Sequence, residues 1–351
     1  MSSVPLRAAG FASRVARFIS ISFGIVVVLG GDRGVRGQPA DTVLTTEVET
    51  GKAKSAWRGS EVAYRNSVTA LTFDPSSELT YNPFWGMALE LSPRLWFGDV
   101  WSVGASLEIQ REITEADDTT RSDETQLGDL SLTFAASRFA KIPGIGADLS
   151  ASLGFAFPTS LASQGSTLLF SVSPSLRIGK TFEQVLEGLT IGYTARFTKL
   201  FHSYTTGELD SPIVPGCFAG SSGSCDRLLN TGVRNASYRL SNTLDLSLGL
   251  AEWVTFSTSF GIVVSWLYDD VVDERVSHTE LEPQDERFAL VADLGFSFQP
   301  AKPLEIRLGA STFNPQLAPD GSRYDPFFNR FTTLYLDLRL DVAALVAELS
   351  E

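Results

Sequence analysis

The chain has 351 residues, of which 43% are hydrophobic, and it carries a formal net charge of −13 at pH 7. This charge argues against a nucleic-acid partner, because neutralising phosphates requires clustered Lys and Arg side chains. Beyond the N-terminus no stretch approaches the roughly 18 consecutive apolar residues of a membrane-spanning helix. If the chain crosses a membrane, it therefore does so with strands.

Residues 1–37 are predicted to be a signal peptide for secretion. Arg7, Arg14 and Arg17 precede an apolar run over 18–29, and small residues follow up to Gly37. This is the charged, apolar and small-residue order of a cleavable signal. The alternative is an uncleaved anchor, although a dozen apolar residues is short for one.

Residues 38–60 form a polar N-terminal segment that precedes the first convincing strand. Its composition fits two interpretations, a plug that enters the barrel from the periplasm and a disordered periplasmic segment. The pattern does not distinguish them.

Alternation of apolar and polar residues is the main structural signal from residue 61 onwards. It is clearest over 253–268, where Phe256, Phe260 and Ile262 fall on one face and Ser257 and Ser259 on the other. Side chains alternate across a strand, so this period of two predicts strands and not helices. Similar segments are predicted at 62–73, 84–97, 100–113, 126–139, 146–158, 167–180, 188–202, 237–250, 286–299, 303–313 and 331–342.

The connections between these segments alternate in length. Those at 98–99, 143–145, 183–187, 251–252 and 301–302 are tight, whereas 203–236, 269–285 and 314–330 are long. Outer-membrane barrels have short periplasmic turns and long extracellular loops. We therefore predict an all-β fold, a transmembrane antiparallel up-and-down β-barrel of about twelve strands over 61–343, in the outer membrane of a Gram-negative cell. Aromatic residues at strand ends, namely Trp85, Trp96, Trp101, Trp253, Trp266 and Tyr268, are predicted to form interfacial girdles.

The strand faces opposite the apolar residues carry charges of both signs, and these are predicted to line the lumen. Such charges can pair across the wall as a structural network, or they can orient solutes in a conduit. The predicted lumen-lining residues are Glu90, Arg94, Glu108, Asp129, Asp148, Arg177, Arg196, Arg239, Asp245, Arg287, Asp293, Glu305, Arg307, Asp337 and Arg339.

Two further features lie outside the strands. Cys217 and Cys225 are the only cysteines and share one Gly/Ser/Pro-rich loop, which in an exported chain favours a disulfide that closes the loop. Residues 344–351 form a C-terminal tail, predicted to be a short periplasmic helix. Many bacterial barrels end instead on an aromatic residue, so an internal one such as Phe331 or Tyr335 is a candidate for the assembly signal.

The order of pieces over 126–166 resembles a known family. A Gly-Asp-Leu strand opening at 128–130 is followed by an apolar strand that ends in Phe-Pro-Thr at 157–159, before a polar loop. This resembles the transporter-like outer-membrane barrels associated with the degradation of phenol and other aromatic compounds. The resemblance covers about 60 residues of the chain. It implies uptake of a small solute, with hydrophobic or aromatic molecules as the candidate class, and carries over no binding residue.

Three classes of function remain open from the sequence. The first is a channel or transporter for passive uptake of small solutes, and the second is a surface or adhesion barrel that acts through its loops. The third is an outer-membrane hydrolase with a site at the rim, for which His202 near Asp210, and His278 near Asp273 and Glu280, are the available bases. No catalytic residue, metal site or cofactor is predicted, because no recognisable motif is present. The expected partners are outer-membrane lipid and lipopolysaccharide, the barrel assembly machinery and an unidentified solute.

Overall fold

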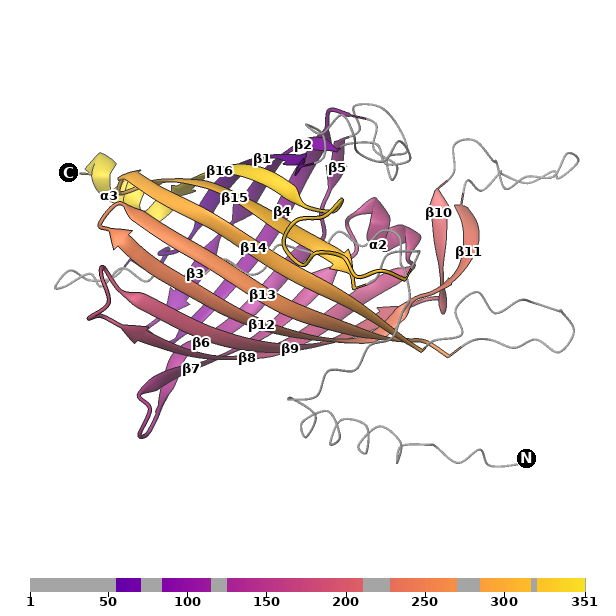
Figure 1. Ribbon diagram of the computed structural model, residues 1–351, viewed down its shortest axis with the longest axis horizontal. Helices are drawn as coiled ribbons and strands as arrows, with labels where there is room; N and C mark the ends of the chain where they lie inside the picture. Colours follow the sequence, from indigo (N-terminus) through magenta and orange to yellow (C-terminus); the bar gives the residue numbers. More distant parts are fainter. Residues whose placement is uncertain are drawn as a thin grey trace, which may run out of the picture.

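The computed structural model describes residues 55–70, 84–114, 125–210, 228–269, 285–316 and 321–350. Within them the chain forms a closed barrel of twelve antiparallel strands, as predicted (Figure 1). The sheet runs in the order β2-β1-β16-β15-β14-β13-β12-β9-β8-β7-β6-β4, and pairing of β2 with β4 closes it. Closure leaves no edge strand in the barrel, which a strand-built membrane protein requires.

The barrel strands follow the alternating segments closely. They are β1 Glu61–Thr69, β2 Trp85–Ser92, β3 Arg94–Phe97, β4 Trp101–Glu112, β5 Thr125–Leu127, β6 Leu130–Ile142, β7 Ala147–Phe157, β8 Leu168–Phe182, β9 Leu189–His202, β12 Ala236–Ala251, β13 Val254–Leu267, β14 Glu286–Ala301, β15 Leu304–Pro315 and β16 Thr333–Asp341. Two predicted strands are interrupted. β2 and β3 are one barrel strand broken at Pro93, which has no N–H to donate. β5 and β6 likewise both pair with β4.

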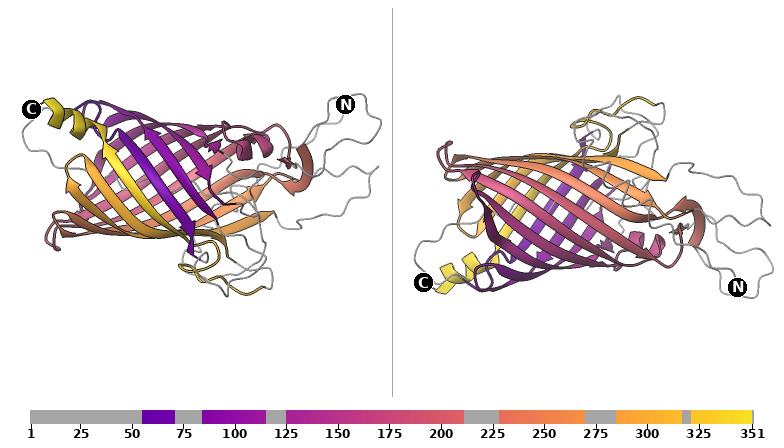
Figure 2. Two further views of the ribbon diagram at one scale, coloured as in Figure 1. Left: turned by 90° about the horizontal axis from the view of Figure 1, so that it is seen from above. Right: turned by 90° about the horizontal axis from the view of Figure 1, so that it is seen from below.

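The short connections all lie at one end of the barrel, here called the turn end, and the long ones at the other, the loop end (Figures 1 and 2). Helix α3, Val342–Ser350, follows β16 at the turn end, where a helix was expected in the tail. At the loop end lie the short helix α2, Leu161–Gly165, and a separate hairpin of β10, Thr206–Asp210, and β11, Leu228–Arg234. That hairpin falls within 203–236, for which the sequence predicted only a loop.

Neither described helix is long and apolar enough to span a membrane. The cysteines predicted to form a disulfide, Cys217 and Cys225, lie outside the described residues, as do His278, Asp273 and Glu280.

Burial separates the two faces of the sheet. Large apolar side chains on one face are well exposed, including Leu244 (56%), Leu308 (48%) and Phe134 (48%), which marks it as the outer face. Polar side chains on the other face are buried, including Asp337 (1%), Asp245 (4%) and Arg339 (7%). The interior of this barrel is therefore polar and its exterior apolar, the reverse of a water-soluble protein.

Candidate functional site: the inner face of the barrel

The strand register places the predicted lumen residues on one continuous inner face. Asp337 lies opposite both Arg65 and Arg307, and Ser259 lies opposite both Asp245 and Asp293. Tracing these pairs around the barrel brings every predicted residue except Asp129 onto that face. Asp129 lies between β5 and β6, where its carboxylate accepts hydrogen bonds from Ser160 N and Ser163 Oγ at the start of α2.

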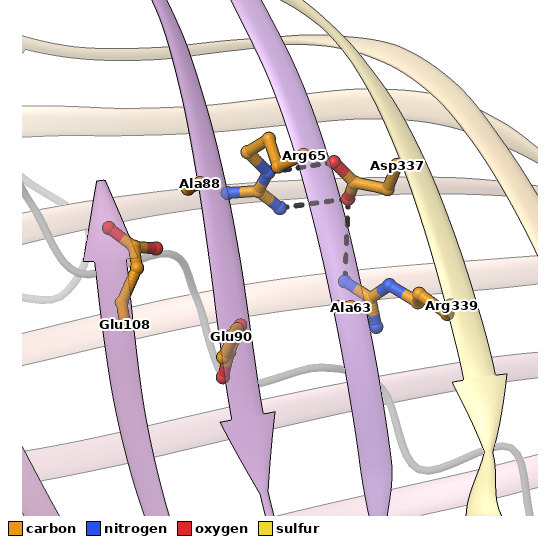
Figure 3. Close-up of a pocket in the computed structure, with 7 residues that line it drawn as sticks. All are labelled: Ala63, Arg65, Ala88, Glu90, Glu108, Asp337 and Arg339. Atoms are coloured by element: carbon orange, nitrogen blue, oxygen red, sulfur yellow. Dashed lines mark hydrogen bonds and ion pairs between the residues drawn. The ribbon is translucent and has the colours of Figure 1, made fainter. Parts of the chain in front are cut away.

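The largest charged cluster is built on β1 and β16. Arg65 donates two hydrogen bonds to Asp337, at 2.7 and 2.8 Å, and Arg339 lies 3.5 Å from the same carboxylate (Figure 3). Arg339 also lies 3.8 Å from Glu61. Two-point arginine–carboxylate pairing is the strongest such geometry, and it offsets the desolvation of a carboxylate as deeply buried as Asp337.

A second cluster lies beside the first, on β14 and β15. Arg307 donates to Asp293 Oδ1 at 2.6 Å, and the Tyr335 hydroxyl donates to Asp293 Oδ2 at 2.9 Å. The guanidinium groups of Arg65 and Arg307 lie 5.3 and 5.4 Å from the centre of the Tyr335 ring. Tyr335 therefore joins the two clusters through cation–π contacts. We call the combined set the charge ladder. Its members are Glu61, Arg65, Asp293, Arg307, Tyr335, Asp337 and Arg339.

A third pair lies on the far side of the barrel. Arg177 on β8 donates to both oxygens of Asp245 on β12, at 2.5 and 2.6 Å, although β9 lies between them. The bridge passes over Gly192, where an added Cβ would lie 2.6 Å from Asp245 Oδ2. The glycine thus leaves the space that the ion pair fills.

Between these groups the inner face is lined mainly by hydroxyls. Ser152 and Ser175 are hydrogen-bonded at 2.7 Å, and Ser173 and Thr198 at 2.9 Å, along β7, β8 and β9. In the barrel order, β7, β8 and β9 lie opposite β15, β16 and β1. A hydroxyl-rich wall therefore faces the charge ladder across the interior.

Glu90 and Glu108 are neighbours on β2 and β4 in direct register. The two glutamates line a small pocket together with Arg65, Asp337 and Arg339 of the charge ladder (Figure 3). The small side chains of Ala63 and Ala88 leave space between the glutamates and the Arg65–Asp337 pair. Glu90 accepts hydrogen bonds from Ser92 and Ser106, at 2.8 and 2.9 Å. Two adjacent carboxylates at one level give this part of the inner face local negative charge.

Three contributors to the network were not among the predicted residues: Glu61, Arg65 and Tyr335. The β1 segment showed the weakest alternation, although Arg65 shares its parity with Ala63 and Ser67. Tyr335 was expected only as an assembly aromatic, yet it faces inward and is 6% exposed. Conversely Asp148 lies on the inner face but joins none of these clusters in the described part of the chain. Arg94 and Arg287 also lie on the inner face, as predicted.

The aromatic residues follow the predicted girdles with one exception. Trp85, Trp101 and Trp253 are 44–62% exposed at strand ends. Trp96 instead lies opposite Ser102 on the inner face, donates Nε1 to Arg58 O at 2.9 Å and is covered by the Arg58 guanidinium at 4.0 Å. Residues near Arg58 therefore pack against the turn end, while the rest of the polar N-terminal segment lies outside the described residues.

His202, one of the two histidines available as a base, lies at the loop end of β9. Its Nδ1 is 2.6 Å from the carbonyl oxygen of Ser166, and its Nε2 is buried without a hydrogen-bond partner. A general base needs a ring nitrogen within reach of substrate or water. No group of three His, Cys, Asp or Glu residues suited to a metal ion occurs in the part of the chain that the structure describes.

Comparison with known proteins gives structural matches alone. No family model matches the chain, and no curated protein matches it. An outer membrane channel from Pseudomonas putida F1 has a similar structure, with a TM-score of 0.51 at 13% identity, covering 84% of this chain and 99% of that one. The fold is that of an outer-membrane β-barrel. The NanC and KdgM porins also align, at 9% identity, with TM-scores of 0.42 and 0.38 over 80% of this chain and 98% of each porin.

The connection from β15 to β16 folds onto the outside of the barrel. Residues 321–332, here called the ledge, lie against the outer wall in both views of Figure 2. Asn329 Nδ2 donates to Thr312 Oγ1 and Asn314 Oδ1, at 3.3 and 3.2 Å, and both acceptors lie on the outer face of β15. The Phe327 ring packs 6.2 Å from Phe260 of β13. The ledge explains why polar side chains on the outer face of β15 are fully buried.

Removing the central amide of the ledge is expected to detach it. Asn329→Ala removes one of the two donors to Asn314 Oδ1, a residue that is 0% exposed, and also the acceptor of Phe331 N–H, so local opening should become about tenfold more frequent. Trypsin cleavage after the exposed Arg323 measures this opening. Phe328→Ala is the control, because that ring is 60% exposed and its loss should leave the cleavage rate unchanged. Equal cleavage rates in the two variants would show that the amide does not hold the ledge.

Proposed function

We propose that the protein is a channel of the outer membrane for passive diffusion of small polar solutes. One observation carries this proposal: the inner face is continuous around the barrel and polar, and its ion pairs lie along the wall. Charges satisfied by their neighbours line the interior without needing partners across it, so the wall is stable while water fills the lumen. The similar structure from Pseudomonas putida F1 is itself a channel.

The ledge supports the same proposal. A loop that folds inward narrows a barrel, whereas the described part of the β15–β16 connection packs on the outer wall. In this proposal the turn end faces the periplasm and the loop end faces the cell exterior, as is usual for outer-membrane barrels. Uptake of aromatic molecules rests on the sequence resemblance alone and stays a prediction, since the described inner wall is mainly hydroxyl and charge.

The first test is single-channel conductance of the refolded mature chain in a planar bilayer, with heat-modifiable gel migration as the check on folding. Discrete conductance steps are expected. A folded protein that gives no steps would contradict the channel and favour a surface role.

Ion selectivity tests which residues line the path. We expect Glu90→Gln together with Glu108→Gln to lower the cation-over-anion permeability ratio by about twofold or more, because charged linings concentrate counter-ions locally. The measurement is the reversal potential across a salt gradient. Glu183→Gln, in the exposed β8–β9 turn, is the matched control and should leave the ratio unchanged. An unaltered ratio in the double variant would place the conducting path away from these carboxylates.

A second candidate function is a surface barrel that binds a partner through its loops. The β10–β11 hairpin favours it, because the hairpin projects beyond the loop end (Figure 1). Cys217 and Cys225 fall between these two strands in the sequence, where a disulfide would close the hairpin. Replacing both by Ser separates the functions: loss of cell-surface binding with unchanged conductance would favour the surface role.

A further inference from the structure

A row of four side chains crosses the outer face near the loop end. Lys199 of β9 lies opposite Tyr238 of β12, Tyr238 opposite Trp266 of β13, and Trp266 opposite Glu286 of β14. Trp266 Nε1 donates to Glu286 at 3.0 Å. Lysine, tyrosine and tryptophan at one level are typical of the boundary between hydrocarbon and headgroups.

The spacing along the barrel agrees with that assignment. Twelve residues separate Val254, at the turn end of β13, from Trp266, which corresponds to about 40 Å along a strand. At the usual tilt of membrane barrels this is about 30 Å along the axis, close to the height of the apolar band with its interfaces. The row therefore lies at the outer-leaflet boundary if the turn end faces the periplasm.

Lys199 is held in place within this row by aromatic rings. Its Nζ is 3.9 Å from the centre of the Tyr238 ring, 5.0 Å from that of Tyr268 and 5.6 Å from that of Phe201. It donates one hydrogen bond, of 2.7 Å, to the buried Ser237 Oγ. Within the described residues Lys199 has no carboxylate partner, so two of its three N–H donors are left for a ligand.

The surface beside Lys199 suits an acyl chain. Val172 lies directly opposite Lys199 on the outer face, and Phe197 and Leu240 follow on that face towards the turn end. Phe197 stacks on Tyr238 at 5.7 Å. A fixed cation above an apolar wall is complementary to a lipid with an anionic head. The chain as a whole is acidic, so overall charge does not attract such a lipid and the attraction has to be local.

We propose that Lys199, with Ser237 and the rings of Tyr238, Tyr268 and Phe201, binds the phosphate of an outer-leaflet lipid. The ammonium donates hydrogen bonds to phosphate oxygens, and an acyl chain lies along Val172, Phe197 and Leu240. The site is independent of whether the barrel conducts.

The test is binding of diphosphoryl lipid A to the refolded mature protein in detergent micelles, measured by native mass spectrometry. Lys199→Gln is expected to weaken binding about tenfold, since it removes a charged donor, and Lys199→Arg should retain most of it. The control is Lys180→Gln. Lys180 lies opposite Ile191 on the outer face near the turn end, over the single ring of Phe182 at 4.8 Å, and its loss should have no effect.

Three outcomes would overturn the proposal. These are unchanged binding by Lys199→Gln, equal losses in the Lys180 and Lys199 variants, and displacement of the lipid by inorganic phosphate alone, which would indicate a free-anion site. Tyr238→Leu tests the site with the charge retained, and several-fold weaker binding is expected. Heat-modifiable migration establishes that each variant is folded.

Discussion

Replacing Asp337 by alanine is expected to lower the free energy of unfolding by about 3 kcal/mol, since this carboxylate is the centre of the charge ladder. It is 1% exposed and is shared by Arg65 and Arg339. Alanine would leave the Arg65 guanidinium without the two-point acceptor that compensates for its desolvation, and Arg339 would lose the nearer of its two carboxylates. A urea titration in lipid vesicles, followed by tryptophan fluorescence, measures the change.

Asp148→Ala is the matched control for this experiment. Asp148 is also an inner-face aspartate in a barrel strand, but it forms no ion pair in the described part of the chain. Its loss should change the unfolding free energy by less than about 1 kcal/mol. Similar losses in both variants would mean that inward carboxylates stabilise the barrel through general polarity and not through the ladder.

The strands and their faces could be predicted from the sequence because both depend on a local pattern. Alternation over about ten residues identifies a strand, and the polar residues of that alternation identify the inner face. The alternation of short and long connections then gives the up-and-down order. The break at Pro93 does not change the strand order or the inner face, since β2 and β3 both pair with β4 along one line.

The partners of the charged residues could not be predicted in the same way. An apolar–polar pattern with a period of two looks the same after a shift of two residues. It therefore fits several registers between neighbouring strands equally well. Arg177 and Asp245 are 68 residues apart and are separated by a whole strand. Their pairing depends on register and on the missing side chain of Gly192. The ledge could not be predicted from the sequence either, because its contacts join a loop to polar residues on a strand face that was expected to be apolar.

Register also explains why glycines appear in the middle of strands that otherwise favour larger residues. Gly309 of β15 lies opposite Tyr335 of β16, and Gly295 of β14 lies opposite Gly309. With no side chain at either position, the tyrosine reaches across β15 to Asp293 on β14. An aromatic ring that covers a cross-strand glycine is a known way to stabilise a sheet at a glycine. The two clusters of the charge ladder are therefore joined through space that the glycines leave.

Gly309→Ala is expected to lower the free energy of unfolding by about 2 kcal/mol, as overpacking of a tightly packed site does. The added Cβ would lie 2.5 Å from the carbonyl oxygen of Leu294 and would also collide with the Tyr335 hydroxyl. The ring would move away from Asp293 and Arg307, separating the two clusters. Gly154→Ala is the control on the inner face of β7, where a Cβ meets Ser173 at an ordinary 3.6 Å.

A double variant identifies the cause of that loss. In Tyr335→Phe the hydroxyl is absent, so part of the collision at residue 309 disappears and the same glycine substitution should be less destabilising. The two changes should therefore couple by about 0.5 kcal/mol or more, as contacting residues do. Strict additivity would mean that the hydroxyl adds nothing to the collision, which the Leu294 carbonyl oxygen and the ring carbon Cζ of residue 335 would then cause.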